Sequence, residues 1–497
     1  MFVALLMTVF LLAVPPRGYE TIAGFTYWLF LLICGGYVLV AMLWHLRRTI
    51  LERPSLETVG KKLKEIPMAQ KCLLGFLLFT LLSGLFSPYP GTFLGPFRRE
   101  GVLTIGIYIL LALCLARDFR PRKWMLVFLG VGLGLVSLLS LIQLTGANPL
   151  GLYPAGHNYY GGGGLYYSGV FLGTIGNAGL LAGYVSLAVG LLAMALIRFD
   201  WKKRWSLAPF LFLGVLLIFE MDIDAALVAL FGGLTLMLPL AVINRKTLGN
   251  TLFVLAVIFG AFALSRVLLF QDGPILFAPI PPGPVIVVGL AALLGLLVRK
   301  HPVFASIPVK WYRRGGVFAM LAIIVSAALF LWFYSGEPSG LLYEASQVLR
   351  GRWDDGFGTR RVYIWRNVLE LIRWETFLLG TGPDTLGHWA IPPFTRELEA
   401  LGITLTSNID AAHNEYLHIL ATGGLLSLLA YLGALFFAAV NWIRRPENAL
   451  SATAGAGVLF YGIQALFGIS QFLAAPFYWA CLGVLLYTQR SDSPYVR

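Results

Sequence analysis

Residues 410–417, DAAHNEYL, mark the point where a polar segment, residues 335–413, gives way to an apolar run. A histidine at such a boundary is placed to touch both water and lipid. Its unperturbed pKa also lets it exchange a proton near neutral pH. If this protein is an enzyme, His413 is therefore the first candidate for a catalytic residue.

The composition indicates a membrane protein. The 497 residues are 58% hydrophobic and 12% charged, with a mean hydropathy of +0.79. A soluble domain cannot bury that much apolar surface, and apolar runs of about 18 or more residues are typical of membrane spans. Spans must be helices or a closed barrel, and these runs lack the alternation of barrel strands. We expect an all-α, polytopic membrane protein with about 12–14 transmembrane helices.

The apolar runs divide the chain into three parts. Residues 1–334 are expected to form the first part of a transmembrane domain, 335–413 an extracytoplasmic loop with short helices, and 414–497 the last membrane helices. The expected spans are 1–14, 22–44, 70–86, 102–116, 124–145, 171–197, 207–221, 223–243, 251–269, 282–298, 316–334, 414–441, 450–472 and 474–488.

The net charge of +13 indicates topology and not a nucleic-acid partner. Most of the 37 lysines and arginines fall in short segments on one face of the membrane, which marks the cytoplasmic side. Both termini are therefore expected in the cytoplasm and the long loop outside. These short loops could not fold into a nucleotide-binding domain, and no G-x-x-x-x-G-K-[ST] motif is present, so ATP-driven transport by this chain alone is not expected. The basic segments are 45–71, 117–123, 198–206, 244–250, 299–315, 441–449 and 489–497.

External arginines, external aromatic residues and His413 suit one kind of substrate. Guanidinium groups bind phosphate oxygens, aromatic faces support sugar rings, and imidazole accepts a proton. A sugar linked to a lipid diphosphate needs this combination, because the anionic leaving group must be neutralised while an acceptor hydroxyl is deprotonated nearby. The arginines are Arg98, Arg99, Arg360, Arg361 and Arg366, and the aromatic residues are Tyr159, Tyr160, Tyr166, Trp353, Trp365 and Trp389.

Residues 360–376 are predicted to form an amphipathic helix that ends before the Gly-Thr-Gly-Pro-Asp turn at 380–384. Val362, Trp365 and Leu369 recur at helical spacing, with arginines between them. Such a helix would lie on the membrane surface and roof a cavity. Glycines on both sides could let it lift to admit a bulky lipid-linked donor.

Each of these features also has an ordinary structural explanation. A boundary histidine often caps a helix, arginines at membrane edges often extend to lipid headgroups, and aromatic residues form interfacial belts. The turn with Glu220, Asp222 and Asp224 could bind a divalent ion, although a solvated turn is the simpler explanation. The residues alone therefore establish only an external polar site on a membrane protein.

Two motifs across the long loop resemble those of the O-antigen ligase and O-antigen polymerase superfamily of bacterial membrane glycosyltransferases. Arg361 to Trp365, RVYIW, followed by GTG at 380–382, resembles the R-x-x-x-W…G-x-G pattern of the large periplasmic loop. Residues 412–417, AHNEYL, followed by GGLL at 423–426, resemble the H-N-x-Y-L…G-L-L start of the next helix. In this order across one external loop they are fairly specific.

Two further stretches are similar to motifs of the same superfamily but are weak alone. Residues 95–101, GPFRREG, are similar to a G-x-x-R-x-x-G segment before an early span. Residues 173–177, GTIGN, look like the G-T-x-G-N opening of a middle span.

The resemblance implies a helical glycosyltransferase fold of the GT-C type. It implies a donor glycan on undecaprenyl diphosphate, with transfer on the extracytoplasmic face of the bacterial cytoplasmic (inner) membrane. His413 would then be the base for the acceptor hydroxyl, Arg361 would hold the diphosphate, and Trp365 would shape the loop helix. Neither a nucleotide sugar, a cofactor nor an essential metal is expected. Asn414, Tyr416 and Asn177 are carried over from the motifs as residues that shape the loop and acceptor site.

The chain departs from this family at one turn. Many relatives carry a Ser-Arg pair between two middle spans, where this chain has Asp-Ile-Asp-Ala-Ala at 222–226. If that arginine grips the diphosphate, Arg98 or Arg99 is the expected replacement. Otherwise the activity is altered or lost.

The acceptor and the class of function remain open at this point. A ligase, a polymerase and a protein O-oligosaccharyltransferase share these motifs. The alternatives of another class are a non-catalytic transporter and an assembly scaffold. A transporter would need charged residues deep within its spans, and few are present.

Overall fold

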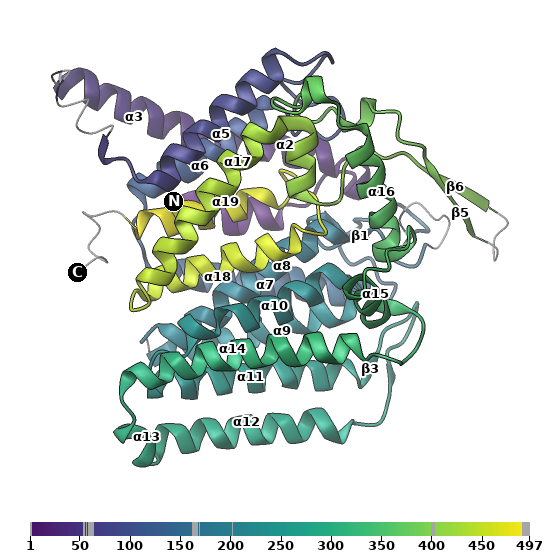
Figure 1. The fold of residues 1–497 in the computed structure, drawn as a ribbon. Coiled ribbons are helices and arrows are strands. Elements are labelled where there is room, and N and C mark those ends of the chain that lie inside the picture. Colours follow the sequence, from purple (N-terminus) through teal and green to yellow (C-terminus); the bar gives the residue numbers. More distant parts are fainter. Residues whose placement is uncertain are drawn as a thin grey trace.

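The computed structural model describes the chain except for residues 1, 53–54, 56, 58–63, 162–166, 168, 201, 399–402 and 490–497. Tyr166, one of the loop aromatics expected to face a sugar, lies outside the described residues. Within the described part, nine helices are long and apolar enough to cross a membrane, and shorter apolar helices accompany them (Figure 1). The prediction of an all-α, polytopic membrane protein is confirmed. The GT-C type stays a prediction.

The apolar helices follow most of the predicted spans. The predicted span 171–197 begins too early, because Phe171–Leu172 (β1) and Gly176–Asn177 (β2) form a short hairpin before the helix. The predicted spans 251–269 and 450–472 end too late, since their helices end at Ser265 and Gln464. The bounds of the apolar helices are Phe2–Leu5 (α1) with Leu6–Phe10 (η1), Ile22–Phe30 (α2) with Leu31–Gly35 (η3) and Gly36–Glu52 (α3), Met68–Leu85 (α5), Val102–Asp118 (α6), Lys123–Gln143 (α7), Ala178–Arg198 (α8), Ala208–Glu220 (α9), Asp224–Ala241 (α10), Arg245–Ser265 (α11), Pro282–Lys300 (α12), Val309–Trp332 (α14), Glu415–Arg444 (α17), Ala449–Gln464 (α18) and Ala475–Tyr487 (α19). The agreement follows from lipid itself, since a span must be both apolar and long enough to cross the bilayer.

Helix α8 is the centre of the bundle and is buried along its whole apolar length. It lies against α18, α10, α9 and α7 (Figure 1). Small residues make this close packing possible, as they do in membrane bundles generally. A side chain at Gly190, for example, would overlap the ring of Phe460 on α18. Helices α12 and α14 lie at the edge of the bundle and leave most of their apolar surface exposed.

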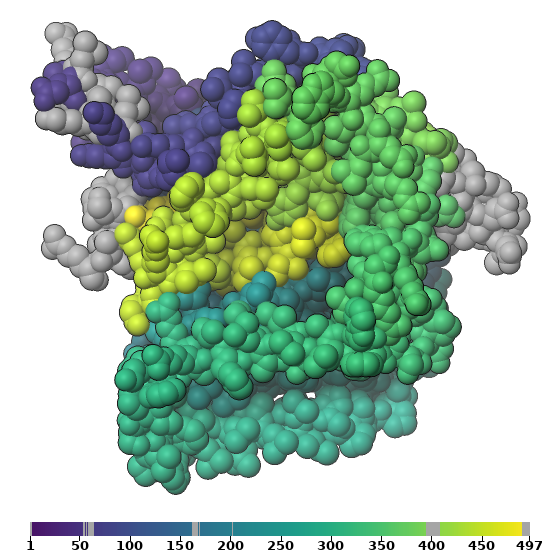
Figure 2. Space-filling view, in the orientation of Figure 1, coloured from purple at the N-terminus to yellow at the C-terminus, as the bar shows by residue number. Residues whose placement is uncertain are grey.

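The long loop, residues 335–413, is a folded layer over one end of the bundle, seen in green in Figure 2. It contains α15 (Gly340–Leu349), α16 (Phe357–Leu371), two 3-10 turns (η6, Trp374–Thr376, and η7, Leu386–His388) and an antiparallel hairpin of β5 (Phe394–Leu398) and β6 (Ile403–Ser407). A small core of its own holds the layer together. That core includes Ile364, Val368, Leu386, Ile391, Ile409 and Ala412.

The predicted helix over 360–376 is correct for its middle and wrong at both ends. Gly358, Thr359 and Arg360 have left-handed backbone angles, so regular helix begins at Arg361. It ends at Leu371, and the short η6 turn follows. The hairpin was not predicted.

Helix α17 is broken inside the membrane domain. Gly424 has φ +79° and ψ 174°, which no helical residue adopts and which glycine tolerates best. Leu425 and Leu426 therefore cannot donate their N–H groups in the usual way. They donate instead to the carbonyls of Phe377 and Leu378 in the loop, at 2.8 and 3.2 Å.

The first half of α17 is tied to the loop as well. The carbonyl of Thr422 accepts hydrogen bonds from the N–H of Gly382 (2.8 Å) and from the hydroxyl of Ser83 on α5 (2.9 Å). A side chain at Gly380 would overlap the carbonyl of Thr422. We call this set of main-chain contacts between residues 377–382 and 422–426 the interlock. It gives a physical reason for the glycines of the GTG and GGLL stretches in this chain, since Gly380 and Gly424 allow the two backbones to meet.

Substitution of Gly424 by alanine is expected to destabilise the fold by on the order of 2–3 kcal/mol. The new Cβ would need a strained left-handed backbone and would overlap residues 378 and 380. The thermal unfolding midpoint of the purified protein in detergent measures this. Gly75→Ala on α5 is the matched control, because its Cβ would meet only ordinary contacts. An unchanged midpoint for Gly424→Ala would rule out the interlock.

Candidate functional site

His413 immediately precedes α17 on the side of the membrane domain that carries the loop. The Asn414 side chain caps this helix by accepting a hydrogen bond from the N–H of Leu417 (3.0 Å). The indole N–H of Trp365 on α16 donates to the carbonyl of Ala412 (3.0 Å). The backbone that carries His413 is therefore fixed from two sides, by its own helix and by the loop helix.

Arg361 joins the loop helix to the segment between α18 and α19. Its Nε donates to the carbonyl of Phe467 (2.8 Å), and a terminal nitrogen donates to the carbonyl of Gly358 (2.7 Å). Burial lowers the pKa of this guanidinium, while the nearby carboxylates of Asp224 and Glu344 act in the opposite direction. Arg361 therefore lies near Asp224, in the 222–226 turn where the resemblance implied an arginine.

Arg98 is held by two carboxylates from the long loop. Its guanidinium forms a bidentate pair with Asp410, at 2.9 Å and 2.6 Å. The backbone N–H groups of Phe97 and Arg98 both donate to Oδ2 of Asp384, at 2.9 and 2.7 Å. The segment before α6 and the long loop thus meet at Arg98.

The environment of His413 favours the neutral imidazole. Burial, together with the positive charges of Arg98 and Arg361, lowers the pKa of His413 to about 4, while Asp410 acts in the opposite direction. The charges of both guanidinium groups therefore act on the imidazole of His413. A neutral ring offers a lone pair to a hydroxyl proton near neutral pH, as a general base requires.

The other predicted site residues have local partners. Arg99 lies over the ring of Tyr27, 5.1 Å from its centroid. Arg360 is exposed at the left-handed start of α16. Arg366 pairs with Asp355 on the outer surface, at 2.9 Å.

Two of the residues carried over from the motifs hold secondary structure in place. Asn177 caps α8 by accepting from the N–H of Leu180 (3.1 Å). The Tyr416 hydroxyl donates to the carbonyl of Gly462 (2.8 Å) and so ties α17 to α18.

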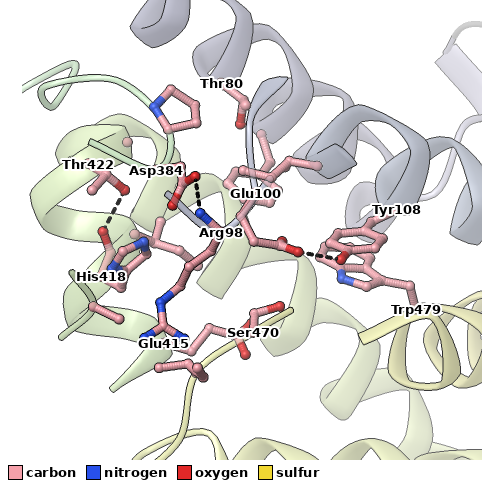
Figure 3. Close-up of a pocket in the computed structure, with 17 residues that line it drawn as sticks. Thr80, Arg98, Glu100, Tyr108, Asp384, Glu415, His418, Thr422, Ser470 and Trp479 are labelled. Carbon is pink, nitrogen blue, oxygen red and sulfur yellow. Dashed lines mark hydrogen bonds between the residues drawn. The ribbon is translucent and has the colours of Figure 1, made fainter. Parts of the chain in front are cut away.

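A small cavity of about 60 Å³, largely apolar but with several ionisable side chains in its lining, lies next to this group, between α5, α6, α17 and α19 (Figure 3). Arg98 and Asp384 line it, together with Glu100, Glu415 and His418. One oxygen of Asp384, one oxygen of Glu415 and Nδ1 of His418 are buried there without a protein partner among the described residues. Buried polar groups of this kind are normally satisfied by water.

Glu100 and Asp384 are site residues that the sequence reasoning missed. Glu100 accepts from the Tyr108 hydroxyl (2.9 Å) and from the N–H of Phe472 (2.7 Å), and burial raises its pKa. Burial also raises the pKa of Asp384, against its hydrogen bonds with the backbone. Their positions in the sequence could have indicated a role in the site. Glu100 directly follows Arg98 and Arg99, and Asp384 ends the Gly-Thr-Gly-Pro-Asp turn.

Unusual backbone angles gather around this site. Among the described residues, the non-glycine residues with positive φ are Arg99, Asp222, Thr359, Arg360, Asp384 and His413. All six belong to the loops and turns on the side of the membrane domain where α6, α10 and α17 begin. Strained residues persist where the surrounding structure holds them, which is common in functional sites.

The fold and site together describe a polytopic membrane protein with an arginine-rich site under the long loop, residues 335–413. Residues 282–432 match a family model described as O-antigen ligase. The match covers less than a third of the chain, and it confirms the resemblance to this family over residues 282–432. The matched stretch includes Arg361, Trp365 and His413. No curated protein matches the chain.

Asp384→Ala is expected to destabilise the site, because the N–H groups of Phe97 and Arg98 would lose their buried acceptor. Each orphaned N–H costs about 1–3 kcal/mol. Thermal unfolding of the purified variant tests this. Asp354→Ala is the control, since Asp354 also accepts a backbone N–H, from Gly356, but on an exposed surface. Equal effects of the two substitutions would contradict a buried anchoring role for Asp384.

Proposed function

We propose that this protein transfers a glycan from undecaprenyl diphosphate to an acceptor hydroxyl on the extracytoplasmic face of a bacterial cytoplasmic membrane. Both termini then lie in the cytoplasm. One observation carries the proposal: a half-buried, neutral His413 lies within electrostatic reach of Arg98 and Arg361, on a backbone fixed by Trp365. A proton acceptor and two cations in one environment match what transfer from a diphosphate requires.

The proposed reaction is a single displacement. The acceptor hydroxyl gives its proton to the imidazole of His413 as its oxygen attacks the anomeric carbon. The bond between that carbon and the diphosphate oxygen breaks, and the electron pair leaves with the diphosphate. The configuration at the anomeric carbon is inverted. Guanidinium groups neutralise the departing charge, so this step needs no metal ion.

In this proposal Arg361 and Arg98 together bind the diphosphate, in place of the arginine that the resemblance implies in the 222–226 turn. Arg361 already lies beside that turn, where Asp224 and Glu344 balance its charge. Arg98 is paired with Asp410 at 2.6 Å. An incoming diphosphate would take the place of Asp410 as its partner. Arg99, exposed beside Tyr27, is placed to meet the outer part of the donor.

The acceptor is proposed to be a lipid core, as in a ligase. A polymerase or a protein O-oligosaccharyltransferase would use the same residues on the donor side. The surface glycan of a deletion strain distinguishes them. Loss of a ligase leaves complete lipid-linked chains without attachment, whereas loss of a polymerase leaves single repeats attached.

His413→Ala is expected to abolish glycan transfer in membranes while the protein level is unchanged. Removal of the general base should cost roughly 100-fold or more in rate. His157→Ala is the matched control, because His157 lies in another external loop and contacts the carbonyl of Ala155. Normal transfer by the His413 variant would end the assignment of this residue as the base.

The pH profile gives an independent test. Because His413 must be neutral to accept a proton, and its pKa is lowered to about 4, activity should not fall as pH is lowered through 6.5. The measurement is kcat/KM for the donor between pH 4.5 and 8. If activity instead fell by half near pH 6.5, and if this transition depended on His413, the pKa of the ring would not be lowered and the assignment would be contradicted.

A further inference from the structure

A second, larger cavity lies at the opposite end of the bundle from His413. Its volume is about 410 Å³, within the range of small-molecule sites. It is bordered by the end of α6, the beginning of α7, the beginning of α18 and the end of α19. Helices α18 and α19 present their other ends to the candidate site, so the two cavities lie toward opposite faces of the membrane domain.

The walls of this cavity are almost entirely apolar. They include Leu6, Met7, Leu115, Phe119, Leu129 and Leu191, which are themselves buried. If a hydrophobic space of this size stayed empty, its walls would lack the packing contacts that stabilise them. Apolar cavities do not hold water well but do bind apolar ligands. An alkyl chain fits this chemistry.

The rim of the cavity is positively charged. Arg122 and Lys123, both exposed, line it where α7 begins. Among the described residues, neither side chain has a recorded hydrogen bond or ion pair. Asp200 is the acidic residue of the lining, and its carboxylate is already paired with Lys246 at 2.7 Å. The rim therefore offers two cations to an anionic group at the level of the membrane surface.

We propose that this cavity binds an anionic glycerophospholipid, with one acyl chain inside and the phosphate at Arg122 and Lys123. An apolar space with a cationic rim complements an amphiphile that has an anionic head. The proposal goes beyond glycan transfer and uses only the orientation proposed above. That orientation places the rim at the cytoplasmic leaflet, where anionic lipids attract basic groups between membrane helices.

The bound lipid would connect elements that are far apart in sequence. The cavity walls come from the first helix, the α6–α7 region and the last two helices. A ligand that binds only the folded protein stabilises it in proportion to its occupancy. The lipid is thus expected to raise the unfolding temperature without taking part in transfer.

The test uses the full-length protein, delipidated in detergent, with phosphatidylglycerol and phosphatidylcholine of identical acyl chains as probes. Native mass spectrometry measures retained lipid, and thermal unfolding measures stabilisation. Phosphatidylglycerol should bind and raise the midpoint, and phosphatidylcholine should do so much less. The double variant Arg122→Gln/Lys123→Gln should bind phosphatidylglycerol roughly 30-fold more weakly, at about a tenfold loss for every 1.4 kcal/mol.

Controls separate this site from general attraction between charges. Arg120→Gln/Lys310→Gln removes two exposed cations from the same face without touching the cavity and should leave binding unchanged. Ala454→Leu fills part of the cavity, leaves the rim intact and should weaken binding. His413→Ala should retain the lipid, so a failure of glycan transfer and a failure of lipid binding are distinguishable. Equal binding of both lipids, or equal binding by the rim variant and its control, would overturn the proposal.

Discussion

The structure depends on hydrogen bonds between two backbones at the break in α17. Lipid cannot satisfy free N–H groups, so a helix that breaks in a membrane domain must find acceptors in protein. Here Phe377 and Leu378 of the loop provide them, and Gly380 and Gly424 make the close approach possible. The long loop, residues 335–413, is therefore part of the membrane domain, bound to it by main-chain contacts.

This attachment determines the position of the site residues. The loop leaves the interlock toward Asp384, whose carboxylate holds the backbone of Arg98. Arg98 in turn holds Asp410, three residues before His413. Trp365 fixes the same segment from α16, whose first regular residue is Arg361. In the proposed function, His413 and the two arginines are thus held in place before substrate arrives, which is how electrostatic stabilisation avoids reorganisation during a reaction.

Much of the fold could be predicted from the sequence, because lipid imposes a simple rule on span length and hydropathy. The association of His413 with Arg361 followed from motif resemblance and from their place on one external loop. The interlock could not be predicted, since Gly423 and Gly424 look like any small residues in an apolar run. Asp384 and Glu100 were missed because their importance comes from burial between loops, which local sequence does not show. Arg366 looked equivalent to Arg361, but helical rotation turns it outward to Asp355.

The most direct test of the central claim is release of undecaprenyl diphosphate by the purified protein in proteoliposomes. The liposomes would contain an undecaprenyl-diphosphate-linked oligosaccharide and a lipid acceptor with a free hydroxyl, without added nucleotide or divalent metal. The account predicts that undecaprenyl diphosphate and glycosylated acceptor appear in equal amounts, with inversion at the anomeric carbon. Binding of the donor without its cleavage, under conditions where the loop is folded, would contradict it.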